Sequence, residues 1–347
     1  MTNEEKREYL NLKIAYQSTP FIVELSKRNE YINKTPKVLY KYRDFDEYSF
    51  DMINNNYVYL TPSGMLDDPF DCLTDIDLSK IIEGDNKTLT KEMMEYIVDI
   101  VFSHPHSNKV DKEYFINLID ECTVDGKIDN KSLEAKLDDY PELSLEQKNL
   151  FYGVMVNFQN TISTMTEDES LKNLFKVLMQ SKEKIGVCSF TTKRDNKPMW
   201  SLYSNKYKGY CVEYETPMTK DVIPNLCPVI YTNDSETNIV KIMVKFGLET
   251  IIRFISSGQI KTNMGCFTEL LCTKDTDWEY QDEWRLIGDA KTKVVPFKIK
   301  NIYLGYDVSK ENEESMLSYA KVKGFGVYKM DKPKGNNKIE YIKLELK

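Results

Sequence analysis

The sequence predicts an α+β fold in which helices flank a central mixed, mainly antiparallel sheet. Short runs of β-branched and aromatic residues recur along the chain, turn-forming residues separate them, and the region 88–184 instead has helical periodicity. The 347 residues are enough to bury a sizeable core, and 41% hydrophobic content is ordinary for a folded protein. We therefore expect an N-terminal helical segment over 1–35, then one α+β domain over 36–347 with a helical insertion at about 88–184.

The predicted strands are rich in β-branched and aromatic residues and are bounded by turn formers. Arg43 ends the first of them, and Pro198 breaks the chain soon after the third. The expected ranges are 38–43, 57–60, 186–191, 209–214, 229–231, 294–299 and 302–305, with a final strand pair after residue 322.

Helices are predicted where apolar residues recur every three or four positions. Pro36 closes the first helical stretch, and Asp44 is a suitable N-cap for a short helix after the first strand. Besides the insertion, the expected helical ranges are 4–32, 45–55, 236–257 and 309–322.

Composition narrows the classes of function. A net charge of −8 gives no broad electrostatic reason to expect a nucleic-acid partner. Only two histidines occur, which leaves few candidates for a histidine general base. The seven cysteines are scattered and form no C-x-x-C pair, so we expect no metal site. No apolar run of about 18 residues and no signal core occur, so we expect a cytoplasmic protein that contacts no membrane.

The most informative stretch runs from Trp278 to Ile287, where acids and an amide lie between two tryptophans and an arginine follows the second. In an extended chain, Gln281, Glu283 and Arg285 alternate onto one face. Such a polar row either faces water or, if it is buried, needs charged partners from elsewhere in the chain. The stretch is therefore a candidate site.

A series of motifs in the same order resembles a bacterial family known only as domain of unknown function 2971. The resemblance covers roughly residues 36–310, although the family itself supplies no activity. Asp67 departs from the asparagine expected at that position and adds a negative charge. The motifs are Leu39–Arg43, Asp67–Asp71, Cys188–Phe190, Met199–Tyr203 with Gly209, and Trp278–Arg285.

A second resemblance implies an activity. ADP-ribosyltransferases of the arginine-serine-glutamate type use an arginine that ends the first strand, then a serine-containing strand, then a glutamine or glutamate two residues before a catalytic glutamate. The chain is similar in its ordered Arg43, Ser189 with Thr191, and Gln281 with Glu283. This resemblance implies an NAD-using enzyme, acting as a toxin or an anti-phage defence effector.

The resemblance also implies a role for each residue in cleaving the nicotinamide bond of NAD. Glu283 would stabilise the oxocarbenium-like sugar cation and hold the ribose, while Arg43 would bind the pyrophosphate. Ser189 would hold the glutamate by a hydrogen bond, and Gln281 would orient the incoming nucleophile. The NAD-binding residues expected in addition to Arg43 are Tyr42, Thr191, Trp200, Tyr203 and Arg285.

Structural explanations stay open for these residues. Arg43 and Glu283 would equally form an ion pair that ties the first strand to a later one, and Ser189 would be a surface or backbone-bonding hydroxyl. Trp200 and Tyr203 lie three positions apart, which is also the spacing of a helical core stripe. Arg285 and Glu279 would also form a cross-strand pair. The Asp67–Asp71 turn would either bind a divalent cation or be an Asx turn that Phe70 anchors in the core.

Two other functions stay open. A non-catalytic module would bind a nucleotide or a phage protein in an aromatic cleft, whereas a nuclease would use a metal ion. The sequence does not identify the acceptor of any ADP-ribose or the role of the insertion. It also does not determine the oligomeric state, and a homo-oligomer stays open. The nuclease set would be Asp68, Asp71, Glu279, Glu283 and Lys274.

Overall fold

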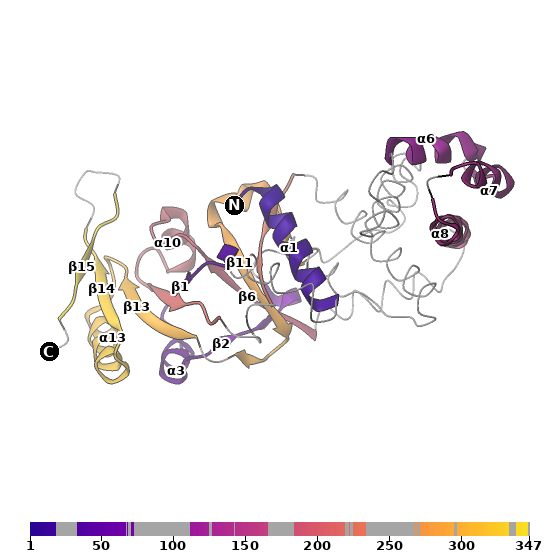
Figure 1. Cartoon of the computed structure of the whole chain (residues 1–347). Helices are drawn as coiled ribbons and strands as arrows, with labels where there is room; N and C mark the ends of the chain where they lie inside the picture. The colour runs from indigo at the N-terminus through magenta and orange to yellow at the C-terminus, as the bar shows by residue number, and fades with distance from the viewer. Residues whose placement is uncertain are drawn as a thin grey trace. The chain divides into compact units, whose positions relative to one another are not determined.

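The protein was analysed as a computed structural model, in which the chain divides into two compact units (Figure 1). The first contains Met1–Thr74, Gln180–Asn233 and Leu271–Lys347, and the second contains Asp75–Met179 and Asp234–Leu270. The structure describes residues 1–18, 33–66, 68, 71–72, 112–124, 127–141, 143–165, 184–218, 222, 225–233, 268, 271–294, 297–332 and 338–345.

A mixed, mainly antiparallel sheet forms the centre of the first unit and confirms the predicted α+β class. Among the described residues it has nine strands: β1 Val38–Arg43, β3 Thr61–Pro62, β6 Ile185–Thr191, β7 Tyr210–Glu215, β8 Leu226–Pro228, β11 Glu283–Asp289, β13 Lys298–Leu304, β14 Gly326–Met330 and β15 Tyr341–Lys343. Their order is β15-β14-β13-β7-β1-β6-β11-β8, and β3 pairs with β6. Only β13 and β14 run parallel among these described neighbours.

Two short strand pairs lie beside this sheet. β2 (Val58–Tyr59) pairs antiparallel with β12 (Lys293–Val294), and β9 (Ile230–Tyr231) pairs parallel with β10 (Thr273–Lys274). The second pair positions a candidate site residue, because β10 carries Lys274 beside Glu283 at the start of β11.

Helices cover both faces of the sheet. In Figure 1, α10 (Lys197–Tyr203) lies on the opposite side from α3 (Ser49–Asn55) and α13 (Lys310–Lys323). The α3 and α13 side forms the larger core, where Ile53 and Met316 join the buried apolar residues of the strands. The helix α1 (Asn3–Ser18) adds Tyr9, whose ring meets Trp284 edge-on at 5.2 Å.

The last predicted helix, expected over 309–322, is confirmed as α13, and both of its ends have local capping signals. Ser309 caps its start by accepting a hydrogen bond from the Asn312 N–H at 3.2 Å, and Gly324 ends it with a φ of 80°. The left-handed backbone at that position favours glycine.

The first short helix begins later than predicted. The proposed cap, Asp44, accepts instead from the neighbouring Phe45 N–H at 2.8 Å. Asp46 accepts from the Tyr48 N–H and the Ser49 hydroxyl, so this stretch is a side-chain-stabilised turn and the helix begins only at Ser49. The predicted helix 236–257, and much of 4–32 and of the 67–71 turn, fall outside the described residues.

The described part of the second unit consists of helices and one hairpin. The helices are α6 (Lys112–Cys122), α7 (Asn130–Asp138) and α8 (Leu145–Met165), and the hairpin pairs β4 (Thr123–Val124) with β5 (Lys127–Ile128). Buried Phe115 and Phe151 pack with ring centroids 5.4 Å apart. Across the residues that the structure describes in both units, no helix is long and apolar enough to cross a membrane.

Candidate functional site

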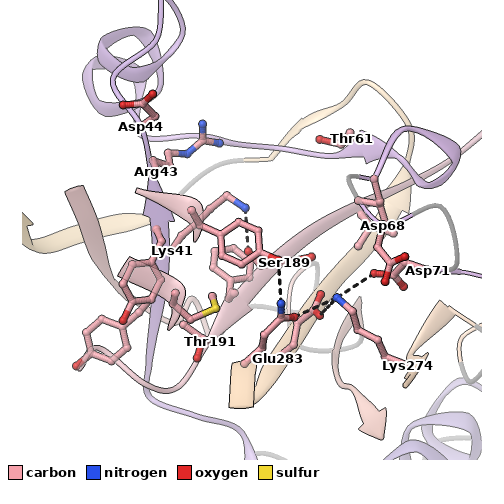
Figure 2. Close-up of a pocket in the computed structure, with 18 of the residues that line it drawn as sticks. Lys41, Arg43, Asp44, Thr61, Asp68, Asp71, Ser189, Thr191, Lys274 and Glu283 are labelled. Atoms are coloured by element: carbon pink, nitrogen blue, oxygen red, sulfur yellow. Dashed lines mark hydrogen bonds and ion pairs between the residues drawn. The ribbon is translucent and has the colours of Figure 1, made fainter. Parts of the chain in front are cut away.

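A pocket of about 340 Å³ lies where β1 and β6 separate (Figure 2). The two strands pair only at Tyr40 and Thr191, while farther along β6 its neighbour is β3, with Thr61 opposite Val187. Between these two contacts Ser189 has no strand neighbour on that edge, although β11 still pairs with it on the other. The split in the sheet therefore creates the pocket.

Lys41 crosses this split. Its Nζ donates a hydrogen bond to the Ser189 carbonyl at 2.8 Å, which satisfies a backbone acceptor in the gap between the strands. Its ammonium group also lies 5.7 Å from the centre of the Phe190 ring. One side chain thus spans the opening and also lines the pocket.

Four buried charged side chains form one cluster at the other side of the pocket. Arg285 donates from Nε to Glu283 Oε1 at 2.7 Å and from Nη2 to Asp71 Oδ2 at 2.6 Å. Lys274 Nζ lies 3.1 Å from the same Asp71 oxygen and 3.2 Å from Glu283 Oε2. The charges of the two cations and the two carboxylates cancel. Buried charges need such partners, because their attraction offsets the free-energy cost of removing them from water.

The cluster keeps Glu283 ionised. Burial would raise the pKa of this carboxyl, but the charges of Arg285 and Lys274 outweigh that effect, and the nearby Ser189 side chain adds to the lowering. The resulting pKa of Glu283 lies well below its ordinary 4.5. The Tyr231 hydroxyl accepts from the Glu283 N–H at 2.8 Å, which also fixes the backbone at this point.

Gln281 reaches the cluster from a helical turn rather than from a strand. Its Oε1 accepts from Lys274 Nζ at 3.0 Å, and its Nε2 donates to the Tyr203 hydroxyl at 2.9 Å. The prediction of an extended chain through Gln281 is wrong. Residues Thr276–Gln281 instead form the 3-10 helix η4, and Asp282 follows with a φ of 44°. The strand begins only at Glu283, yet the three polar side chains still converge.

Both tryptophans of the motif have structural roles. The Trp278 ring lies under Lys274, with Nζ 5.0 Å from the ring centre, a distance typical of a cation–π contact. Trp284 points to the opposite side of β11, into the larger core with Leu286. The motif therefore supports the charge cluster on one face and the core on the other.

Arg43 lines the opposite side of the pocket from this cluster (Figure 2). Its Nε is buried and has no hydrogen-bond partner among the residues that the structure describes. The Arg43–Glu283 ion pair left open by the sequence is not formed, because Arg285 and Lys274 are the cations that pair with Glu283. Arg43 is thus available to an anion in the pocket.

A tight loop holds the end of β1. Asn205, Lys206 and Tyr207 all have positive φ angles, of 47°, 53° and 67°. Gly209 follows, and a Cβ placed on it would lie 2.1 Å from the Arg43 carbonyl oxygen. Glycine is required for this close approach, and backbone strain of this kind is common next to functional sites.

Most predicted site residues line the pocket, namely Tyr42, Arg43, Ser189, Thr191, Tyr203, Gln281 and Glu283. Trp200 and Arg285 do not. Trp200 has no exposed surface and packs edge-on against Tyr42 at 5.2 Å, as a core residue would. Arg285 is also fully buried, and it pairs with Glu283 and Asp71 rather than with Glu279.

Sequence reasoning missed Lys41 as a pocket residue, although it stands in the Leu39–Arg43 motif. The available signal was its position two residues before Arg43, which places both side chains on one face of a strand. The pairing of Asp71 with Arg285 carried no such signal, since 214 positions separate the two residues.

Comparison with known proteins adds one match. None of the curated proteins or solved structures compared with this chain is significantly similar to it. Residues 199–286, which include Tyr203, Gln281 and Glu283 of the pocket, match the model of the family described as protein of unknown function (DUF2971).

Proposed function

We propose that the pocket binds NAD and that the protein is an ADP-ribosyltransferase-like enzyme, serving as a toxin or an anti-phage effector. One observation carries the proposal: Arg43, Ser189, Gln281 and Glu283, which come from three separate segments, line a single pocket. The Ser189 side chain also helps to lower the pKa of Glu283, in line with the role that the proposed chemistry gives it.

Glu283 would act on the nicotinamide ribose. When the bond between the sugar and nicotinamide breaks, its electron pair leaves with the pyridine nitrogen and positive charge develops on the sugar. A carboxylate held in a fixed position stabilises that charge without reorganising. Arg285 and Lys274 hold Glu283 in place, and their charges are shared with Asp71, so they do not neutralise Glu283 alone.

The opposite wall would take the diphosphate. Arg43 offers a planar, permanently charged donor, and Lys41 lies two residues before it on the same strand. Phe190, Tyr42 and Tyr203 supply aromatic surface for the nicotinamide ring. The volume of about 340 Å³ is near the lower end for small-molecule sites, so it suits the reacting half of NAD with the adenosine end outside.

The same geometry favours NAD chemistry over the metal-dependent nuclease. Asp71 and Glu283 already accept from two cations, and Glu279 does not line the pocket. Within the described ranges, no three His, Cys, Asp or Glu side chains are grouped so as to hold a metal ion. Asp68 does line the pocket, but its place there requires no metal.

Nicotinamide release from NAD tests the proposal, measured by chromatography with and without cell extract as a source of acceptors. The wild type should release nicotinamide, and Glu283→Gln should lose at least about 100-fold in rate, a typical cost of removing one transition-state contact. Glu213→Gln is the matched control, since Glu213 is also a buried strand glutamate but pairs with Tyr303 and Lys300 outside the pocket. No release from the wild type under either condition, together with no thermal stabilisation by NAD, would refute the proposal.

A further inference from the structure

Lys41 and Arg43 form a pair of cationic groups on one face of β1. Two residues along a strand span about 7 Å, and both side chains line the pocket. The partners of Lys41 Nζ are uncharged: it donates to the Ser189 carbonyl and lies over the Phe190 ring. No carboxylate in the described part of the chain forms a salt bridge with it, so its charge is not held by a counterion.

The surroundings of Lys41 favour the neutral amine. Burial lowers the pKa of Lys41, and the neighbouring Arg43 charge lowers it further, while Cys188 and the more distant Glu283 act in the opposite direction. The net shift is downward. A lysine in this situation has a larger unprotonated fraction near neutral pH than a surface lysine, and the unprotonated amine is the nucleophilic form.

We propose that Lys41 is a nucleophilic amine that forms a Schiff base with short phosphorylated aldehydes, whose phosphate is bound by Arg43. An amine and a guanidinium that come from residues about 7 Å apart along the strand and line one pocket suit a molecule with a carbonyl at one end and a phosphate at the other. Arg43 Nε has no hydrogen-bond partner among the described residues and would gain one from the phosphate.

The reaction balances without any further reactant. The lone pair of Lys41 Nζ attacks the carbonyl carbon, and the carbonyl oxygen takes up a proton to give a carbinolamine. Loss of water then leaves a protonated imine, and the addition of water reverses the step. This activity goes beyond NAD cleavage, and its test contains no NAD, so the two proposals succeed or fail separately.

Pyridoxal 5′-phosphate is the probe, with borohydride added to reduce the imine to a stable secondary amine and mass spectrometry to locate it. At pH 7.5 we expect Lys41 to be labelled about ten times faster than the exposed Lys206, because burial and the Arg43 charge lower the pKa of Lys41 and leave more of its amine unprotonated. Inorganic phosphate should slow labelling of Lys41 in the wild type and leave Lys206 unchanged. Equal labelling of the two lysines, or a Lys41 rate insensitive to phosphate, would overturn the proposal.

Two variants separate the amine from its phosphate-binding neighbour. Lys41→Arg should abolish the label at this position. Arg43→Gln should slow labelling of Lys41 by pyridoxal 5′-phosphate about tenfold but leave labelling by pyridoxal, which has no phosphate, nearly unchanged. An equal loss with both aldehydes would contradict the role of Arg43, and the phosphate competition in the wild type gives the answer if this variant does not fold.

Discussion

Arg285 and Asp71, which are 214 positions apart in the sequence, meet in a buried ion pair with Nη2 and Oδ2 separated by 2.6 Å. Arg285 also donates to the Leu271 carbonyl at 2.6 Å, so one guanidinium joins three separate chain segments. A buried charge of this kind is tolerated only while its partners remain. The stability of the pocket wall therefore depends on it.

Replacing Arg285 should be among the most damaging single changes. Arg285→Met leaves Asp71 and Glu283 buried with Lys274 alone, and we expect the free energy of unfolding to fall by about 3–5 kcal/mol. Urea denaturation measures this free energy of unfolding. Lys293→Met, which breaks an exposed ion pair with Asp51, is the control and should change little. Similar losses in the two variants would contradict the importance of burial.

Glu283 should make stability depend on acid pH. Because Arg285 and Lys274 hold its pKa below the ordinary 4.5, the ionised group contributes stability above pH 4.5, and that contribution is lost as pH falls through the lowered pKa. The melting temperature of Glu283→Gln should be below that of the wild type at pH 7, and the difference should shrink as the pH falls below 4.5. A constant difference across this range would exclude the linkage.

Gly209 should tolerate no side chain. In Gly209→Ala the new Cβ would collide with the Arg43 carbonyl, so we expect a loss of about 1–3 kcal/mol in stability, together with weaker NAD binding. Gly64→Ala is the matched control, because a Cβ there has no neighbour within 4 Å. Thermal unfolding and NAD titration compare the stability and the NAD affinity of the two variants. Equal values would show that the close approach to Arg43 contributes to neither.

Ser189→Ala should separate catalysis from folding. Loss of the Ser189 hydroxyl, which helps to keep Glu283 ionised, leaves the salt bridges of that carboxylate in place, so the fold should remain while kcat for nicotinamide release falls about tenfold and KM changes little. Ser201→Ala, on the exposed side of α10, should have no effect. A Ser189→Ala enzyme with unchanged kcat would remove this serine from the mechanism.

Local patterns were enough to predict most of the sheet and the helix after Ser309, because strand composition and capping residues act over a few positions. They were not enough at η4. The alternation of Gln281, Glu283 and Arg285 also fits a strand, whereas the left-handed backbone at Asp282 turns the chain between the first two. The side chains converge because the turn and the strand are both anchored by Lys274 and Tyr231.

The site was predictable in its residue types but not in its partners. Arg43, Ser189 and Glu283 stand out in the sequence because of their order, yet the counterions of Glu283 come from the same strand and from β10 rather than from Arg43. Lys274 lies on β10, which pairs with β9 rather than with β11, and strand pairing is a long-range property. The same reason hid Lys41, whose role follows only from the gap between β1 and β6.

A crystal structure with an NAD analogue in which a methylene group replaces the ring oxygen of the nicotinamide ribose tests the central claim most directly. We predict that the nicotinamide ribose lies within hydrogen-bonding distance of Glu283 and that the diphosphate contacts Arg43. An analogue bound elsewhere, or a pocket left empty at saturating concentration, would contradict it.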